Sequence, residues 1–379
     1  MRSKNTIFGE SRLFAALLLV ALLVPFPAAA QRARGPVAVL PQDSAGGTDD
    51  FFYVDSNNGS LTHVDRLRRD PLEIRSRRLR QNLFQEIGRP TDQPASLGEI
   101  LLGPIRTSDL NARAALFVET STGYVAYFDQ LGKNDVLGRI STVIGRPFGA
   151  IASADGNYAL LMRHNTNGRT EGAYLYHASS GRGLWLAGIV KLEIDVEATP
   201  VPGFPKLSGR VAAAELQFSE LTTGYLLADS ADGTLRFLSL DDNARLSVRD
   251  TTVKLFPTFD PQAASGTPNR FVAAPVRNSN ETTTHVLFAD AATGDLAILE
   301  GVDEDDGEPV LRKLAANLYS VLGIAAGSGP HSLTAIAGRD ANGATNGVWL
   351  TDSATRAMAY VESPDAPDST TVQRVRVGN

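Results

Sequence analysis

Cysteine is absent from this chain of 379 residues, and its absence excludes disulfide bonds, thiolate metal sites and cysteine nucleophiles. Histidine is scarce as well. The five histidines stand at positions 63, 164, 177, 285 and 331, and none pairs with another at metal-ligand spacing. Positive charge is in the minority, since the formal net charge is −6, so the basic footprint of a nucleic-acid binder is missing. We expect no metal, no cofactor and no nucleic-acid partner.

Only one long apolar run occurs, and it lies near the N-terminus. A basic start with Arg2, Lys4 and Arg12 precedes the Leu-rich residues 13–26, and the small residues 28–30 are typical of a cleavage site. We therefore expect a signal peptide over residues 1–30 that is cleaved after Ala30. A retained membrane anchor is the alternative, but Pro25 and Pro27 interrupt the run.

The expected mature chain is acidic. Removal of three basic residues and Glu10 leaves 33 basic and 41 acidic residues, a net charge of −8. No cysteine follows the cleavage site, which excludes a bacterial lipid anchor. We expect a secreted or periplasmic monomer without a membrane span after cleavage.

A short turn recurs six times along the chain. The copies are residues 55–59 (Asp-Ser-Asn-Asn-Gly), 119–123 (Glu-Thr-Ser-Thr-Gly), 177–181 (His-Ala-Ser-Ser-Gly), 229–233 (Asp-Ser-Ala-Asp-Gly), 290–294 (Asp-Ala-Ala-Thr-Gly) and 352–356 (Asp-Ser-Ala-Thr-Arg). Asp, Ser and Thr side chains start such turns, and a left-handed glycine closes them. Arg356 replaces that glycine in the last copy, which predicts either a strained residue or a different turn there. Apolar and aromatic runs flank each copy, as expected for strands.

The repeat predicts an all-β fold. We expect one β-propeller domain over residues 31–379, with six four-stranded antiparallel blades and seven blades as the alternative. Residues 372–377 alternate in polarity as a strand does, and they remain over after six blades. We therefore expect them to supply the first strand of the first blade and close the ring. The basic residues 66–80 fall in an irregular insert, where Leu79, Leu83 and Ile87 permit a short amphipathic helix.

The third repeat resembles a known family. Residues 145–156 follow the pattern G-x-P-x-x-x-x-x-S-x-D-G, and a strand, a polar loop and a further strand lead from there to the turn at 177–181. This resembles the YVTN and lactonase-like propellers of exported bacterial proteins, which are kin of the WD-repeat propellers. The resemblance implies that the repeated turns lie between the third and fourth strands of a blade, away from the ligand face. It also implies that ligands meet the loops between the second and third strands.

Arginine with asparagine or aspartate opens several of these loops. The candidate ligand-binding residues are Arg106, Arg163, His164, Asn165, Arg277, Asn278, Asn280, Arg339, Asp340 and Asn342. A ring of guanidinium groups at a channel mouth suits carboxylates, phosphates or sugar hydroxyls. The alternative is that the arginines merely end strands and the asparagines turn loops.

No catalytic constellation can be assembled from the sequence. We therefore expect a non-enzymatic protein that binds a small anionic or carbohydrate ligand, or a protein partner. The lactonase resemblance implies a hydrolase of sugar lactones as one alternative, for which His164, Glu171 and Arg163 have the right type but crowd one loop. A periplasmic assembly propeller of the Tol-system type is another. A deep pocket where histidine and carboxylates converge would favour an enzyme, and a shallow Arg- and Asn-lined face would favour a binder.

Overall fold

The structure is a computed structural model with two compact units, Met1–Arg34 and Gly35–Asn379. It describes residues 37–44, 47–55, 58–69, 72–86, 100–106, 114–119, 124–128, 140–143, 157–187, 198–241, 245–264, 270–303, 307–325, 331–352 and 354–378. All of these belong to the second unit. The predicted signal peptide and its cleavage site lie outside the described residues. Within the described ranges, no helix is long and apolar enough to cross a membrane.

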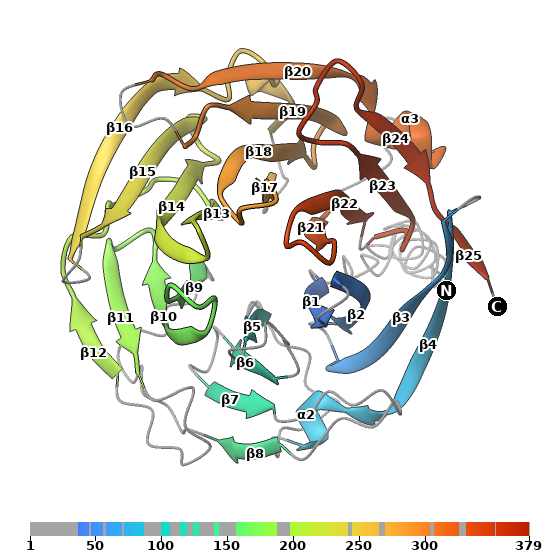
Figure 1. Cartoon of the computed structure of the whole chain (residues 1–379), viewed down its shortest axis with the longest axis horizontal. Coiled ribbons are helices and arrows are strands. Elements are labelled where there is room, and N and C mark those ends of the chain that lie inside the picture. The colour runs from blue at the N-terminus through green and yellow to red at the C-terminus, as the bar shows by residue number, and fades with distance from the viewer. Residues whose placement is uncertain are drawn as a thin grey trace, which may run out of the picture. The chain divides into compact units, whose positions relative to one another are not determined.

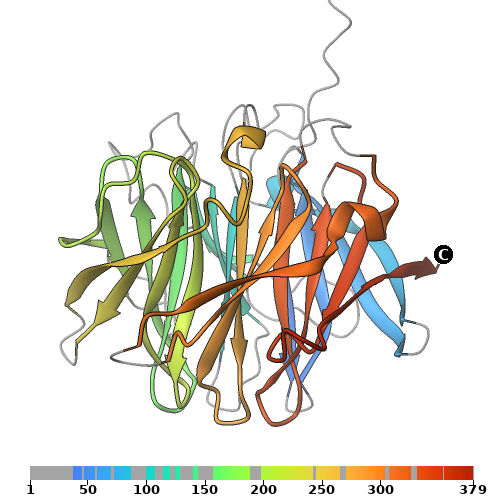
Figure 2. The same ribbon diagram turned by 90° about the horizontal axis from the view of Figure 1, so that it is seen from above.

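The second unit is an all-β propeller, with its sheets set in a ring around a central axis (Figure 1). In each sheet the strand earliest in the chain lies innermost, and the strands run between two opposite faces (Figure 2). The first sheet contains β1 (Val37–Ser44), β2 (Gly47–Asp55), β3 (Ser60–Arg69), β4 (Leu72–Asn82) and β25 (Arg376–Gly378).

Five further sheets have four antiparallel strands each. From the inside outward they are β5 (Ile100–Ile105), β6 (Ala114–Glu119), β7 (Tyr124–Phe128) and β8 (Ile140–Val143); β9 (Tyr158–His164), β10 (Thr170–His177), β11 (Arg182–Leu186) and β12 (Ala198–Val201); β13 (Val211–Phe218), β14 (Leu221–Asp229), β15 (Thr234–Leu240) and β16 (Leu246–Lys254); β17 (Phe271–Arg277), β18 (Thr283–Asp290), β19 (Asp295–Glu300) and β20 (Val310–Asn317); and β21 (Leu333–Arg339), β22 (Thr345–Asp352), β23 (Met358–Glu362) and β24 (Thr371–Arg374). Short helical turns α2 (Leu83–Glu86), η1 (Pro261–Ala264) and α3 (Leu318–Leu322) follow β4, β16 and β20.

The repeated turn connects the second strand of a blade to the third. Between β14 and β15, Asp229 Oδ1 accepts the amide of Ala231 at 2.9 Å, and the amide of Gly233 donates to the Asp229 carbonyl at 2.9 Å. Gly233 has a φ of 70°, and a Cβ there would lie 2.8 Å from the ring of Phe256. Both the conformation and the close approach therefore require glycine.

The turn was predicted between the third and fourth strands, and this is wrong by one strand. In the third repeat the innermost strand is β9, so the turn follows the second strand, β10. The predicted first strand within residues 145–153 lies outside the described residues. The turns and the polar loops still lie on opposite faces, as predicted, because successive connections of an antiparallel sheet alternate between its two ends.

Neighbouring sheets pack face to face through apolar side chains. Leu226 and Phe237 of one sheet join Phe271 and Phe288 of the next in a single cluster, and all four are at most 4% exposed. The last sheet meets the first in the same way, since the rings of Trp349 and Phe51 lie 5.6 Å apart. Packing thus runs around the whole ring and needs no disulfide.

A polar latch repeats between blades. The backbone N–H at the end of an innermost strand donates to a threonine Oγ1 on the second strand of the next sheet. The pairs are Arg106 to Thr170 at 2.9 Å, His164 to Thr222 at 2.7 Å, Gln217 to Thr283 at 3.0 Å, Arg277 to Thr345 at 2.9 Å and, across the closure of the ring, Arg339 to Thr48 at 3.1 Å. All five threonines are buried. Each latch satisfies an amide that the strand's own sheet leaves open and fixes the position of the adjacent blade.

The predicted fold class is confirmed in its architecture and corrected in its count. The fold is all-β with four-stranded antiparallel blades, but within the described residues five sheets are of this kind, not six or seven. The first sheet differs because it takes up a fifth strand, β25, which pairs in parallel with β4.

The ring closes differently from the prediction. We expected residues 372–377 to become the innermost strand of the first sheet, but β1 holds that place by pairing with β2. The C-terminal segment instead gives β24 to the last sheet and β25 to the outer edge of the first. The short helix predicted over Leu79, Leu83 and Ile87 is confirmed only in part, as α2 (Leu83–Glu86). Leu79 lies within β4, which pairs with β3, and helical geometry begins at Leu83.

We predict that Thr345→Val lowers the free energy of unfolding by about 1–3 kcal/mol, because the buried amide of Arg277 loses its acceptor. Thr345→Ser keeps the hydroxyl and should retain most of the stability. Urea unfolding of both variants checks this. Equal stability of the valine and serine variants would show that the latch contributes nothing.

Candidate functional site

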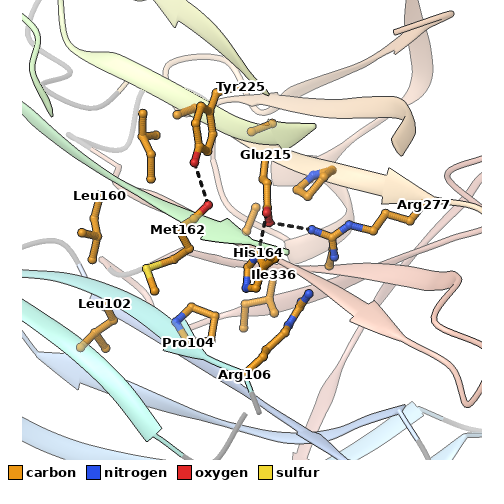
Figure 3. A pocket seen from close by; sticks show the side chains of 16 residues that line it. Leu102, Pro104, Arg106, Leu160, Met162, His164, Glu215, Tyr225, Arg277 and Ile336 are labelled. Atoms are coloured by element: carbon orange, nitrogen blue, oxygen red, sulfur yellow. Dashed lines mark hydrogen bonds and ion pairs between the residues drawn. The ribbon is translucent and has the colours of Figure 1, made fainter. Parts of the chain in front are cut away.

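A cavity of about 220 Å³ lies in the central channel, and the innermost strands β5, β9, β13, β17 and β21 provide most of its wall (Figure 3). Alternate residues of a strand face the same side, so residues two positions apart reach the channel together. Along β5, β9 and β17 these residues end in a polar one: Leu102, Pro104 and Arg106; Leu160, Met162 and His164; and Pro275 and Arg277. The channel is thus apolar along most of its wall and polar where the innermost strands end.

Glu215 breaks this pattern. It lines the cavity from β13, two residues before the strand-end residue Gln217, where the neighbouring strands carry Pro104, Met162 and Pro275. A carboxylate in such a place is costly unless it is paired and hydrogen-bonded.

The carboxylate of Glu215 is fully engaged. Oε1 accepts hydrogen bonds from Thr222 Oγ1 at 2.5 Å and Gln217 Nε2 at 2.9 Å, and it lies 2.7 Å from His164 Nδ1. Oε2 pairs with the guanidinium of Arg277 at 3.1 Å. Three innermost strands, β9, β13 and β17, therefore converge on one carboxylate (Figure 3).

The charges follow from this shell. Burial alone would raise the pKa of Glu215, but its contacts with His164, Arg277 and Arg106 outweigh burial and lower the pKa below its ordinary value. Burial and the neighbouring Arg106 lower the pKa of Arg277 to about 10, so it keeps its charge at neutral pH. Burial lowers the pKa of His164 despite the nearby carboxylate. At pH 7 the cluster therefore holds an ionised Glu215, a charged Arg277 and a neutral His164.

The shorter contact decides the tautomer of the neutral imidazole, since Nδ1 lies 2.7 Å from Glu215 Oε1 and 3.3 Å from Gln217 Nε2. An ionised carboxylate can only accept hydrogen bonds, so the proton of His164 must sit on Nδ1, facing Glu215. The opposite nitrogen, Nε2, then carries a lone pair. His164 is 1% exposed, and its Nε2 is buried without a hydrogen-bond partner in the described part of the chain. Arg277 Nε is likewise buried and without a partner among the described groups.

The predicted site residues separate into two groups. His164, Arg106 and Arg277 line the cavity together, as a ligand site requires. Arg339 forms a buried ion pair with Glu281 and does not line it. Arg163, one residue before His164, points away from the channel, where it pairs with Glu171 at 3.6 Å and lies over the Trp185 ring.

The asparagines and the aspartate shape loops. Asn165 Oδ1 accepts the amides of residues 167 and 169 at 3.0 and 3.1 Å. Asn278 Oδ1 accepts those of Asn280 and residue 282 at 2.9 and 3.1 Å, and Asp340 Oδ1 those of Asn342 and residue 344 at 2.8 and 3.0 Å. In each of these three loops, one side-chain oxygen accepts the amides two and four residues further along the chain. The alternative interpretation of these residues as turn formers therefore holds.

The loops themselves also need correction. They connect the first strand of a blade to the second, because β9, β17 and β21 are innermost. The predicted residues that come together therefore meet in the central channel. They do not meet on a face formed by loops between second and third strands.

Sequence reasoning missed Glu215 and Gln217. The sequence did contain a signal for Glu215. It follows the small apolar run Val-Ala-Ala-Ala of β13, at a position where a further small or apolar residue is expected. Among the described residues, no group of three or more His, Asp or Glu side chains is placed to hold a metal ion.

Comparison with known proteins adds likeness in fold. No family model matches the chain, and no curated protein matches it. Among solved structures, it is similar to a putative 6-phosphogluconolactonase from Bacteroides uniformis with 15% identity and a TM-score of 0.47, covering 90% of this chain and 85% of that one. A protein from Lactobacillus plantarum matches with 12% identity and a TM-score of 0.49 over 91% and 85% of the two chains. The WD40 domain of coronin from Toxoplasma gondii matches with 10% identity and a TM-score of 0.41 over 91% and 73%. These likenesses concern the propeller architecture alone.

We predict that Glu215→Gln lowers the free energy of unfolding at pH 7 by about 3–5 kcal/mol, because it leaves the buried charge of Arg277 uncompensated. The double variant Glu215→Leu, Arg277→Leu removes both charges and should cost less than the two single leucine variants together. Glu300→Gln is the control, since Glu300 pairs with a half-exposed Arg312 and should change stability by less than about 1 kcal/mol. Additive costs at Glu215 and Arg277 in chemical denaturation would contradict the pairing.

Proposed function

We propose that this propeller binds a small hydroxylated carboxylate, the chemistry of a sugar acid, in the cavity of its central channel. One observation carries the proposal: His164 Nε2 is a buried acceptor without a partner among the described residues, and it belongs to a side chain that lines the cavity. Buried polar atoms are almost always hydrogen-bonded, and a ligand that occupies the cavity can supply the missing partner.

The cavity wall complements both groups of such a ligand. A hydroxyl donates to His164 Nε2, because the tautomer set by Glu215 leaves that nitrogen as an acceptor. A carboxylate suits the guanidinium of Arg277, whose Nε–H is directed to no acceptor within the described residues. Arg106 adds a second guanidinium to the same wall. The volume of about 220 Å³ limits the ligand to a molecule smaller than a typical drug.

A second candidate function is hydrolysis of a sugar lactone, which the pairing of His164 with Glu215 at 2.7 Å favours. In this reaction His164 Nε2 takes a proton from water, the water oxygen bonds to the lactone carbonyl carbon, and the ring C–O bond breaks. The imidazolium then returns the proton to the leaving alkoxide. Glu215 holds the imidazole in the required tautomer and stabilises its charged form. The sequence analysis named a pocket where histidine and carboxylates converge as the mark of an enzyme. The meeting of His164 and Glu215 in the cavity supports the hydrolase on that ground as well.

We also propose that the protein is exported, because the first 30 residues combine a basic start, an apolar run and a small-residue cleavage site. Under this proposal the ligand is one that is available in the periplasm or outside the cell.

We predict that gluconate raises the melting temperature of the chain from residue 31 onward, whereas glucose and acetate, each lacking one of the two groups, raise it less. Saturation at about a hundred times the Kd corresponds to roughly 2.7 kcal/mol of added stability. His164→Gln should weaken binding roughly 5- to 150-fold in calorimetric titration, because leaving a buried donor of the ligand without its acceptor costs about 1–3 kcal/mol. His285→Gln is the matched control, since its Nδ1 contacts Thr284 and it does not line the cavity.

No thermal shift with any sugar acid, or unchanged binding by His164→Gln, would sink the small-ligand proposal. In that case a protein partner becomes the better account. Turnover of glucono-1,5-lactone above its rate in buffer, lost in His164→Gln and kept in His285→Gln, would support the hydrolase instead of the binder.

A further inference from the structure

The last copy of the repeated turn departs from the others at its final residue. Gly59, Gly181, Gly233 and Gly294 close their turns with φ between 67° and 73°. Arg356 stands at the same position with a φ of 61°. A side chain in the left-handed region is disfavoured, and strain of this kind often persists where a residue serves a function.

The surroundings of this turn differ as well. In three other sheets the residue pair after the fourth strand covers the turn glycine with an aromatic ring. A Cβ on Gly59, Gly233 or Gly294 would lie 2.6–2.8 Å from Phe84, Phe256 or Tyr319. In the last sheet the corresponding pair after β24 is Val375 and Arg376, so an arginine replaces the aromatic residue.

The pairing of the last strand explains the difference. The fourth strands β4, β16 and β20 each carry a bulge near the turn, and the following leucine amide donates to the turn glycine carbonyl at 2.7–2.8 Å. β24 pairs with β23 without a bulge, and the amide of Val375 donates to Met358, two residues beyond Arg356, at 3.0 Å. The last strand therefore ends short of its turn.

A surface hollow of about 580 Å³ lies at this place, and Arg356, Arg374 and Arg376 line it. All three side chains are exposed, Arg356 by 65%. Asp55 is the one described carboxylate paired with any of them, at a long 3.8 Å from Arg356. Positive charge thus exceeds negative charge on this wall, on a chain whose net charge is −6.

We propose that this hollow binds an oxyanion of the phosphate class. Guanidinium forks pair with two oxygens at once, and three of them around one hollow suit a tetrahedral anion. Binding also gives a reason for the left-handed arginine, since glycine would fit the turn equally well but would leave one wall of the hollow uncharged. The site is separate from the central cavity, because the two share no lining residue. The proposed oxyanion site can therefore be tested independently of the proposed function.

The test is a comparison of wild-type protein with Arg356→Gly, which restores the residue of the other turns. In phosphate, against chloride at equal ionic strength, the wild type should gain melting temperature. Arg356→Gly should lose at least tenfold in phosphate affinity by calorimetry, while its melting temperature in chloride stays equal or rises because the strain is relieved. Arg374→Ala with Arg376→Ala should also lose binding. Arg245→Ala, at an exposed arginine just before β16, should bind as the wild type does.

A second arm distinguishes the source of the phosphate. Vesicles of phosphatidylglycerol in phosphatidylcholine are compared with phosphatidylcholine alone. Binding to the anionic vesicles that Arg356→Gly abolishes would support the site and assign it to a lipid headgroup, whereas a response to inorganic phosphate alone would assign it to a free anion. The proposal is overturned if the wild type responds to neither probe, or if Arg356→Gly responds as strongly as the wild type.

Discussion

Five innermost strands end near a residue whose backbone amide needs a partner, and a threonine hydroxyl of the next blade provides it. The latches join the ends of β5, β9, β13 and β17 to the second strand of the next sheet. The latch of β21 reaches Thr48 of the first sheet and so crosses the closure of the ring. Three of the five latched residues, Arg106, His164 and Arg277, also line the central cavity. The constraint that joins the blades therefore also positions the site.

Thr222 connects the two levels most directly. Its hydroxyl accepts the amide of His164 and donates to Glu215, so one side chain serves as a latch and as part of the carboxylate's shell. The shell keeps Glu215 ionised in an apolar layer and leaves His164 neutral, with its proton on Nδ1. A rigid ring thus presents a preorganised acceptor and a guanidinium to the same cavity, and such preorganisation lowers the cost of binding.

The sequence was informative where local chemistry repeats and misleading where pairing decides. The side chain of Asp229 and the backbone of Gly233 favour a turn by themselves, so the repeated turn could be predicted from the sequence. Glu215 could not be assigned a role, because its partners lie 51 and 62 residues away and meet it only when the ring closes. The role of the C-terminal strand likewise depends on β1, since only the finished sheet shows that the innermost place is already taken.

Ligand binding in the central cavity requires a neutral His164 with its lone pair on Nε2. Nitrogen-15 NMR of the imidazole groups tests this directly, with the His164 signals identified by their loss in a His164→Gln sample. We expect Nδ1 to carry the proton at pH 7, Nε2 to show the shift of an unprotonated nitrogen, and the ring to titrate with a pKa below its ordinary value. A proton on Nε2, or a doubly protonated ring at pH 7, would contradict the assignment of His164 as the acceptor of the cavity.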